Sequence, residues 1–277
     1  MTLKSGNMDA FGLTNIGKVR KVNQDQFLIA SLMKLVHIEQ TSLPDREQTQ
    51  LTEPGQAAML MVADGVGGQQ AGEKASETAL ETVARYVAQA MRCYYTVDAA
   101  TEERFIEELR DAVLRTHEAV REEAERHPDR HGMATTLTLV KVVNRRAYVV
   151  QVGDSRCYLR RGDTLSQVTR DQTVAQDLID QGVMSEATAE HSPFSHILSS
   201  AIGGKAYPEV YTLDLETDDV LLLCTDGLNK HVSDEEIAEQ LGTSDTVESI
   251  GTRLVETTLE RGASDNVTVV VARVLPE

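Results

Sequence analysis

Two long segments of the chain repeat their buried-type positions at helical spacing. In residues 71–92 these positions recur every four residues, at Ala75, Ala79, Val83, Val87 and Met91. In residues 101–126 they recur every three or four residues, at Phe105, Leu109, Val113, Thr116 and Val120. The opposite sides of both segments are rich in Glu, as on a solvated face. The pattern therefore predicts two amphipathic helices.

Short apolar runs separated by turn residues predict a series of strands. Strands at 134–143 and 145–152 meet at an Asn-Arg turn, and strands at 155–160 and 164–168 meet around Gly162. Strands joined so tightly have to be antiparallel, because a parallel pair needs a long crossover. Further strands are predicted at 26–31, 57–63, 209–213, 219–225 and 266–274, and shorter helices at 172–182, 233–242 and 244–261, with Ser233 and Glu236 in a capping box. This order favours an α+β layered sandwich over a doubly wound parallel sheet.

Chain length and one linker-like stretch bear on the domain organisation. At ~150 residues per domain, 277 residues correspond to between one and two domains. The stretch Glu39–Gln56 is rich in Gln, Thr and Pro but is too short to separate domains, so we expect a surface excursion within a single domain over residues 1–277.

Charge and cysteine usage exclude several classes of function. Asp and Glu number 44 against 27 Lys and Arg, a formal charge of −17, which argues against nucleic acid and anionic membrane as partners. The longest apolar run, Ala57–Ala63, is far shorter than the ~20 residues that span a bilayer, and Met1–Phe11 has no signal-peptide pattern. Cys93, Cys157 and Cys224 lack zinc or redox spacing, so we expect buried free thiols in a cytoplasmic protein.

One local arrangement recurs at the boundaries of the apolar strands. An Asp stands beside a small or turn-forming residue at Asp64-Gly65, Gly153-Asp154, Asp226-Gly227 and Asp265-Asn266. A single Asp-Gly is most often only a turn. Four such acids, each next to a buried strand, are either solvated or converge on a cation.

If the acids converge, their chemistry selects the cation. Carboxylates and a glycine carbonyl are hard oxygen donors, which suit Mg²⁺ or Mn²⁺. Several carboxylates around one point raise each other's pKa unless divalent charge neutralises them. More than three acids suit two ions about 3.5–4 Å apart, an arrangement that polarises a phosphoryl oxygen and deprotonates a bridging water.

Seven motifs, taken in order, resemble those of a known family. They are Arg20-Lys21-Val22-Asn23-Gln24-Asp25, Val62-Ala63-Asp64-Gly65-Val66-Gly67-Gly68, Gly132-Met133-Ala134-Thr135-Thr136, Gly153-Asp154-Ser155-Arg156, Ala201-Ile202-Gly203-Gly204, Thr225-Asp226-Gly227-Leu228 and Ser264-Asp265-Asn266. Together they are similar to the motif set of the metal-dependent Ser/Thr protein phosphatases of type 2C, in the bacterial form. The resemblance covers about residues 12–274.

The resemblance implies a fold and a set of metal ligands. The fold is a four-layer α-β-β-α sandwich with two central antiparallel sheets and a flap over about residues 173–204. Two Mn²⁺ or Mg²⁺ ions are implied, with Asp64 bridging them, the Gly65 carbonyl on one, and Asp226 and Asp265 on the other. Asp154 matches the acid that helps to bind a weaker third ion in bacterial members.

The resemblance also implies roles for two residues near the N-terminus. Asp25 acts through water on the metal centre, and Arg20 grips the substrate phosphate, to which a planar guanidinium is suited. Without the resemblance, Arg20 is interpreted as a solvated loop residue.

The sequence departs from the family pattern at several positions near the expected site. Gln24 stands where many members carry Glu, which removes one charge from the surroundings of the first ion. Val66 stands where animal members carry His, so water or solvent has to protonate the leaving group. Gln172 replaces a frequent His beside the flap, and His196 within the flap is the histidine of most interest.

These observations predict a protein serine/threonine phosphatase that hydrolyses phosphoserine and phosphothreonine by in-line attack of an activated water. None of the three cysteines lies in a Cys-x₅-Arg setting, which argues against thiol chemistry. The expected partners are phosphorylated Ser/Thr proteins, including a Ser/Thr kinase or its targets. Two alternatives stay open: a phosphoprotein-binding pseudophosphatase, and a phosphatase dedicated to one regulatory partner.

Overall fold

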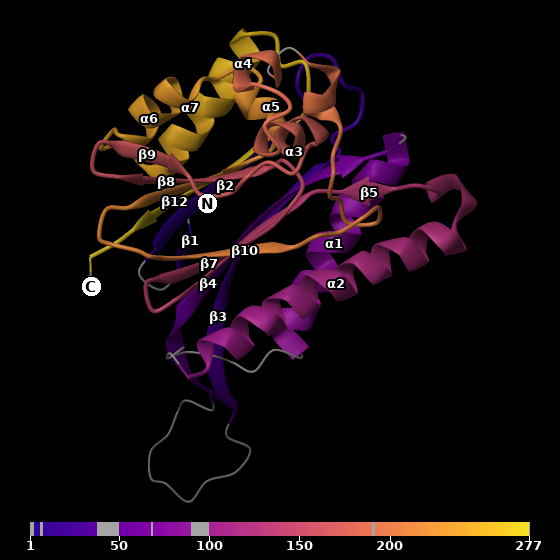
Figure 1. Cartoon of the computed structure of the whole chain (residues 1–277). Helices are drawn as coiled ribbons and strands as arrows, with labels where there is room; N and C mark the ends of the chain where they lie inside the picture. The colour runs from indigo at the N-terminus through magenta and orange to yellow at the C-terminus, as the bar shows by residue number, and fades with distance from the viewer. Residues whose placement is uncertain are drawn as a thin grey trace, which may run out of the picture.

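The strands form two antiparallel sheets that lie face to face (Figure 1). The computed structural model describes residues 3–5, 8–37, 50–67, 69–89, 100–189 and 192–276. One sheet has the order β1 (Leu3–Ser5), β2 (Met8–Asn15), β12 (Val267–Val274), β11 (Val220–Cys224), β8 (Arg156–Arg161) and β9 (Thr164–Gln167). The other has the order β10 (Glu209–Asp214), β7 (Arg146–Val152), β6 (Leu137–Val143), β4 (Gln50–Val66) and β3 (Asp25–His37), and β5 (Ala134–Thr135) pairs with the end of β4.

Helices cover the outer faces of both sheets (Figure 1). The helices α1 (Gln69–Gln89) and α2 (Glu102–Arg126) pack on the sheet that contains β4, and α2 is followed by the short η1 (Pro128–Arg130). The other sheet is covered by α5 (Asp226–Asn229), α6 (Asp234–Leu241) and α7 (Val247–Glu260). The short elements α3 (Val174–Asp180), α4 (Glu186–Ala189) and η2 (Pro193–His196) lie at the end of the sandwich near α5. The four-layer arrangement expected from the sequence is confirmed.

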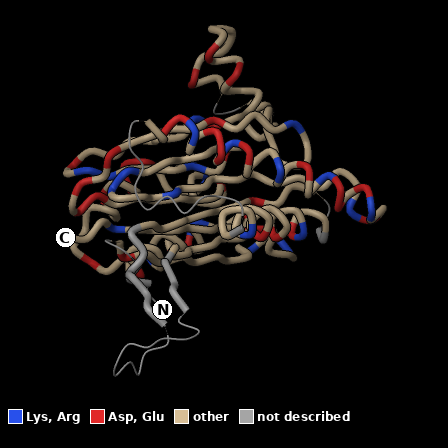
Figure 2. Tube along the Cα trace, turned by 90° about the horizontal axis from the view of Figure 1, so that it is seen from below, with Lys and Arg blue, Asp and Glu red and all other residues tan. Residues whose placement is uncertain are grey.

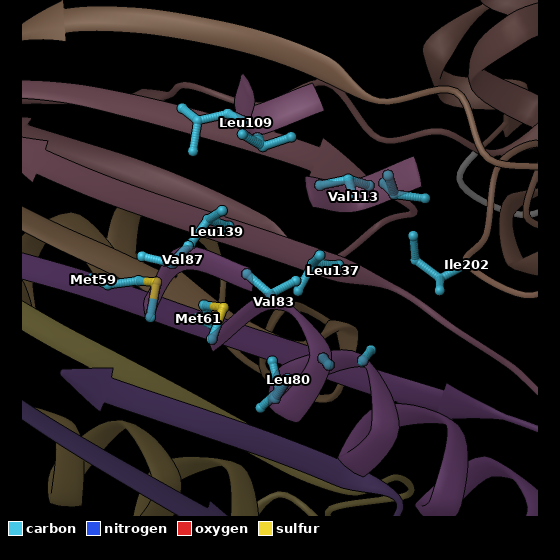
Figure 3. Packing of buried hydrophobic residues seen from close by; sticks show 14 of the residues in the cluster. Met59, Met61, Leu80, Val83, Val87, Leu109, Val113, Leu137, Leu139 and Ile202 are labelled. Atoms are coloured by element: carbon cyan, nitrogen blue, oxygen red, sulfur yellow. The ribbon is translucent and has the colours of Figure 1, made fainter. Parts of the chain in front are cut away.

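The central strands are buried on both faces, and their side chains alternate between two apolar layers. In β4, Leu60 and Val62 pack between the sheets, whereas Met59 and Met61 pack against the outer helices. Figure 3 shows Met59 and Met61 close to residues of the helices and of β6. Because successive side chains of a strand point to opposite faces, burial on both sides requires a continuous apolar run.

Several sequence predictions are confirmed in detail. Asn144 and Arg145 both have positive φ, 48° and 62°, as the tight turn between β6 and β7 requires. Ser233 and Glu236 form the predicted capping box at the start of α6. Cys157 and Cys224 are buried and free, while Cys93 lies outside the described residues.

Other features differ from the predictions. The strand β2 has no counterpart among the predicted strands, and the predicted strand 134–143 is divided at Thr136 into β5 and β6. Residues 50–56 of the expected surface excursion belong to β4, and residues 38–49 lie outside the described residues. None of the described helices has the length and apolarity needed to cross a membrane. Figure 2 shows acidic and basic positions interspersed along the described trace.

We expect Leu139→Ala to lower the free energy of unfolding by about 2–5 kcal/mol, because Leu139 is fully buried between α2 and the sheet and its truncation leaves a cavity. Leu114→Ala is the matched control, since Leu114 is 42% exposed on α2. Urea unfolding of both variants measures the difference. Equal losses of stability would contradict this account of the core.

Candidate metal centre

The sheet topology gathers the acids at one end of the sandwich. Asp25 at the start of β3 and Asp64 in β4 are register partners on neighbouring strands. Asp226 follows the end of β11, and Asp265 precedes the start of β12. Because β11 and β12 pair in antiparallel fashion, the end of one strand lies beside the beginning of the other. The fifth acid, Asp154, follows β7 in the other sheet.

The strand that carries Asp64 does not end there, contrary to the sequence prediction. β4 continues through Gly65 to Val66: its pairing with β3 ends at Asp64, its pairing with β6 ends at Val62, and β5 pairs with Gly65 and Val66. Thr136 holds the Asp64 backbone from both sides, since its Oγ1 accepts from the Asp64 N–H at 2.9 Å and its N–H donates to the Asp64 carbonyl at 2.9 Å. The backbone of Asp64 is therefore fixed by a neighbouring segment.

Gly65 lies in close contact with the start of α1. A Cβ on Gly65 would lie 2.1 Å from the carbonyl oxygen of Gly72, which no side chain can accommodate. The Gly65 N–H donates to the Gln24 carbonyl at 3.1 Å. The segment that contains Gln24 is thereby joined to the segment that contains Asp64.

Asp25 is buried between the two sheets and joins them. Its side chain is 1% exposed, and Oδ2 accepts hydrogen bonds from Thr225 Oγ1 at 2.7 Å and Thr268 Oγ1 at 2.8 Å. Thr268 belongs to β12 of the opposite sheet, and Thr225 directly follows β11 of that sheet. The other oxygen, Oδ1, is buried without a hydrogen-bond partner among the described residues.

Gln172 holds the turn that carries Asp154. Its Oε1 accepts from the Gly153 N–H at 2.9 Å, and its Nε2 donates to the Tyr207 carbonyl at 2.9 Å. Gly153 has a φ of +103°, a conformation that L side chains rarely adopt. The residue that departs from the family pattern thus anchors the turn beside Asp154.

Asn266 holds the loop that carries Arg20. Its Oδ1 accepts from the Gln24 N–H at 2.9 Å, and its Nδ2 donates to the carbonyls of Ile16 at 2.9 Å and Val22 at 3.1 Å. Sequence reasoning assigned no role to Asn266. Its three contacts lie more than 240 residues away along the chain, which no local pattern reveals.

Two cations contact the acids that flank β11 and β12. Lys230 Nζ lies 2.6 Å from Asp226 Oδ2 and 2.9 Å from Asp265 Oδ2. Arg20 binds Asp265 through both Nε at 2.7 Å and Nη2 at 2.8 Å, and its side chain is 51% exposed. Sequence reasoning missed Lys230, because no helix was predicted over residues 226–230 and its spacing of four residues from Asp226 has meaning only within the helical turn α5.

The acids fall into two groups by the direction in which their pKa is shifted. Burial, followed by the charges of Asp25 and Asp226, raises the pKa of Asp64 well above its usual value. Burial is also the main cause that raises the pKa of Asp25 to about 7 and that of Asp154 to about 7, with Asp226 contributing to both. For Asp265 burial would raise the pKa, but hydrogen bonds from Arg20 and Lys230 outweigh it and hold the pKa below its usual value. These effects require the acids to lie near one another.

The donor set fits hard divalent cations. Within the described ranges, no three Asp, Glu, His or Cys side chains are yet grouped closely enough to ligate one ion. However, Asp226 Oδ1 is buried without a hydrogen-bond partner among the described residues, as is Asp25 Oδ1. Unpaired buried carboxylate oxygens and a backbone carbonyl such as that of Gly65 are ligands that Mg²⁺ and Mn²⁺ prefer. The donor chemistry of the residues present therefore fits such ions, and in this structure Arg20 and Lys230 occupy the Asp265 oxygens.

Comparison with known proteins identifies the family. The family model "Protein phosphatase 2C" matches residues 37–270. The chain belongs to the protein phosphatase 2C family. The resemblance found from the sequence motifs is confirmed.

Several relatives of this type 2C chain are bacterial phosphatases. Serine/threonine protein phosphatase PstP of Mycobacterium tuberculosis is 37% identical over 220 residues, 79% of this chain and 41% of PstP. Serine/threonine phosphatase stp of Listeria monocytogenes is 32% identical over 215 residues, 77% of this chain and 83% of stp. A solved structure of the PstP catalytic domain with two manganese ions is similar at a TM-score of 0.75 and 31% identity, covering 97% of this chain and 99% of that one. The chain spans about two fifths of the length of PstP.

We expect the chelator-treated protein to lose stability through Asp25 as the pH rises from about 4 to about 7. The pKa of about 7 in the folded state lies above the unfolded value of about 3.9, so the folded form keeps a proton that the unfolded chain has released. The free energy of unfolding contributed by Asp25 then falls over this window and is constant above it.

Urea unfolding in EDTA of the wild type and Asp25→Asn at several pH values measures this contribution. The wild type should lose on the order of 3 kcal/mol relative to the variant, because Asn cannot titrate. A difference that stays constant between pH 4 and pH 7 would show that Asp25 does not carry the shifted pKa.

Proposed function

We propose that the chain is a protein serine/threonine phosphatase that hydrolyses phosphoserine and phosphothreonine with the aid of two Mn²⁺ or Mg²⁺ ions. The observation that carries the proposal is the position of five acids in or next to separate strands at one end of a protein phosphatase 2C fold. Names of the relatives support it, since PstP and stp are serine/threonine phosphatases and a PstP structure contains two manganese ions.

The proposed ligands follow the expectations set by the motifs. Asp64 would bridge the two ions, the Gly65 carbonyl would complete one of them, and Asp226 and Asp265 would hold the other. Asp154 would help to bind a third, weaker ion. When bound, divalent ions would supply polarisation of a phosphoryl oxygen and a lowered pKa of water, the chemistry that in-line hydrolysis of a phosphate ester requires.

The protein's own residues orient the reactants. Asp25 Oδ1, which has no hydrogen-bond partner among the described residues, is available to orient a water molecule at the centre. Arg20 is half exposed and held by Asp265, so its guanidinium is available to bind a phosphate dianion from a defined position. Val66 is 44% exposed and cannot donate a proton, which leaves protonation of the leaving alcohol to water.

The proposal also covers the substrates of the enzyme and its compartment in the cell. The substrates would be phosphorylated Ser/Thr proteins, including a Ser/Thr kinase or its targets. The buried free thiols Cys157 and Cys224 support a reducing compartment, which is the cytoplasm.

Hydrolysis of p-nitrophenyl phosphate and of a phosphothreonine peptide tests the proposal. We expect turnover with Mn²⁺ and none with EDTA. Asp226→Asn should lower turnover by about 100-fold or more, because it removes a charged ligand worth several kcal/mol of transition-state stabilisation.

Asp163→Asn is the matched control, since Asp163 is exposed in the turn between β8 and β9. It should retain full turnover. Activity that survives chelation, or Asp226→Asn at the wild-type rate with an unchanged melting profile, would refute the mechanism. Binding of the phosphopeptide without turnover in Mn²⁺ would instead identify a pseudophosphatase.

A further inference from the structure

Lys230 is held in a defined position beside the proposed metal ligands. It is the residue that ends α5, and its N–H donates to the Asp226 carbonyl at 3.1 Å. Gly227, in the same turn, packs so tightly on β12 that a Cβ would lie 1.9 Å from the Asn266 carbonyl oxygen. The helical turn therefore packs directly against Asn266, and the Lys230 side chain starts from a defined backbone position.

The Lys230 ammonium contacts the same two carboxylates that the proposed divalent ion needs. Nζ lies between Asp226 Oδ2 and Asp265 Oδ2, at 2.6 and 2.9 Å. A Mg²⁺ or Mn²⁺ ion binds carboxylate oxygen at about 2.0–2.2 Å, so ion and ammonium would lie within a few ångströms of each other. Like charges at such a distance repel strongly in a partly buried site. The ion and the ammonium therefore exclude each other.

A neighbouring cavity can receive the displaced side chain. A cavity of about 270 Å³ is lined by Lys230 and Asp226, by Asp154, and by residues of the expected flap such as His196. Lysine has a flexible four-carbon stem, and Asp154 offers a second carboxylate inside this cavity. The ammonium can leave Asp226 and Asp265 without entering apolar surroundings.

We propose that Lys230 is an internal cation that competes with the second divalent ion for Asp226 and Asp265 and thereby sets a weak affinity for that ion. The inference rests on the proposed function, which assigns these two acids to the ion. Competition by Lys230 makes occupancy of the second site depend on the concentration of Mn²⁺ or Mg²⁺. Among the described contacts, no ammonium competes in this way for the ion held by Asp64 and Gly65.

Calorimetric titration of the chelator-treated protein with Mn²⁺ tests the competition. Lys230→Met keeps much of the side-chain bulk and removes the charge, so it should bind the second Mn²⁺ at least about tenfold more tightly than the wild type. Lys230→Arg keeps the charge and should stay within about threefold of the wild type. Lys74→Met is the control for net charge, because Lys74 pairs with Glu77 on α1, and its affinity should be unchanged.

A second measurement uses the wild type alone and does not depend on how the variants fold. Reductive methylation of lysines, quantified by mass spectrometry, should label Lys230 faster in Mn²⁺ than in EDTA, with Lys74 as the internal reference. Equal labelling of Lys230 in both conditions, or a Lys230→Met affinity equal to or weaker than that of the wild type, would overturn the inference.

Asp226→Asn separates this inference from the proposed function. If Asp226→Asn loses the second Mn²⁺ while Lys230→Met binds like the wild type, only the role of Lys230 is wrong. If the wild type binds no Mn²⁺, or Asp226→Asn binds it equally well, the assignment of the metal centre is wrong and the inference falls with it.

Discussion

The hydrogen bonds accepted by Asp25 are the contacts on which the arrangement of the acidic centre depends. Asp25 belongs to β3 in one sheet, while one donor, Thr268, belongs to β12 of the other sheet and the second, Thr225, directly follows β11 of that sheet. A buried carboxylate is costly unless its oxygens are paired, so these hydroxyls have to stay in place. The two sheets are thereby fixed relative to each other at the end where Asp64, Asp226 and the other acids lie. A shift of one sheet over the other would leave the Asp25 charge buried without donors.

The hydrophobic pattern predicted the parts of the fold that are buried on two sides. The strands β4, β11 and β12 were recognisable because burial on both faces leaves a continuous apolar run. The strand β2 was not, since its residues alternate irregularly and most are only partly buried. It becomes a strand because it pairs with β12 from Met8 to Asn15, a contact between the two ends of the chain that local propensity does not encode.

The acids of the site could be located from the sequence, but most of the contacts that position them could not. An Asp beside Gly at the edge of an apolar run is a local signal, and it marked Asp64, Asp154 and Asp226. Thr268 and Gln172 carry no comparable signal, because their importance arises from partners far away along the chain. Gln172 is an example. The motifs marked it only as a departure from the family pattern, whereas in the structure its side-chain amide hydrogen-bonds to the Gly153 N–H and to the Tyr207 carbonyl.

The centre balances its negative charge in two different ways. Around Asp265 and Asp226 the protein supplies permanent positive charge, through Arg20 and Lys230. Around Asp25 and Asp154 burial favours bound protons, which is why burial raises their pKa to about 7. On the proposed function, divalent ions would have to replace both kinds of positive charge, so their binding is coupled to proton release on one side and to movement of an ammonium on the other. Such coupling follows from the presence of five carboxylates in one partly buried space. In the metal-free protein their negative charge has to be balanced by bound protons or by neighbouring cationic side chains.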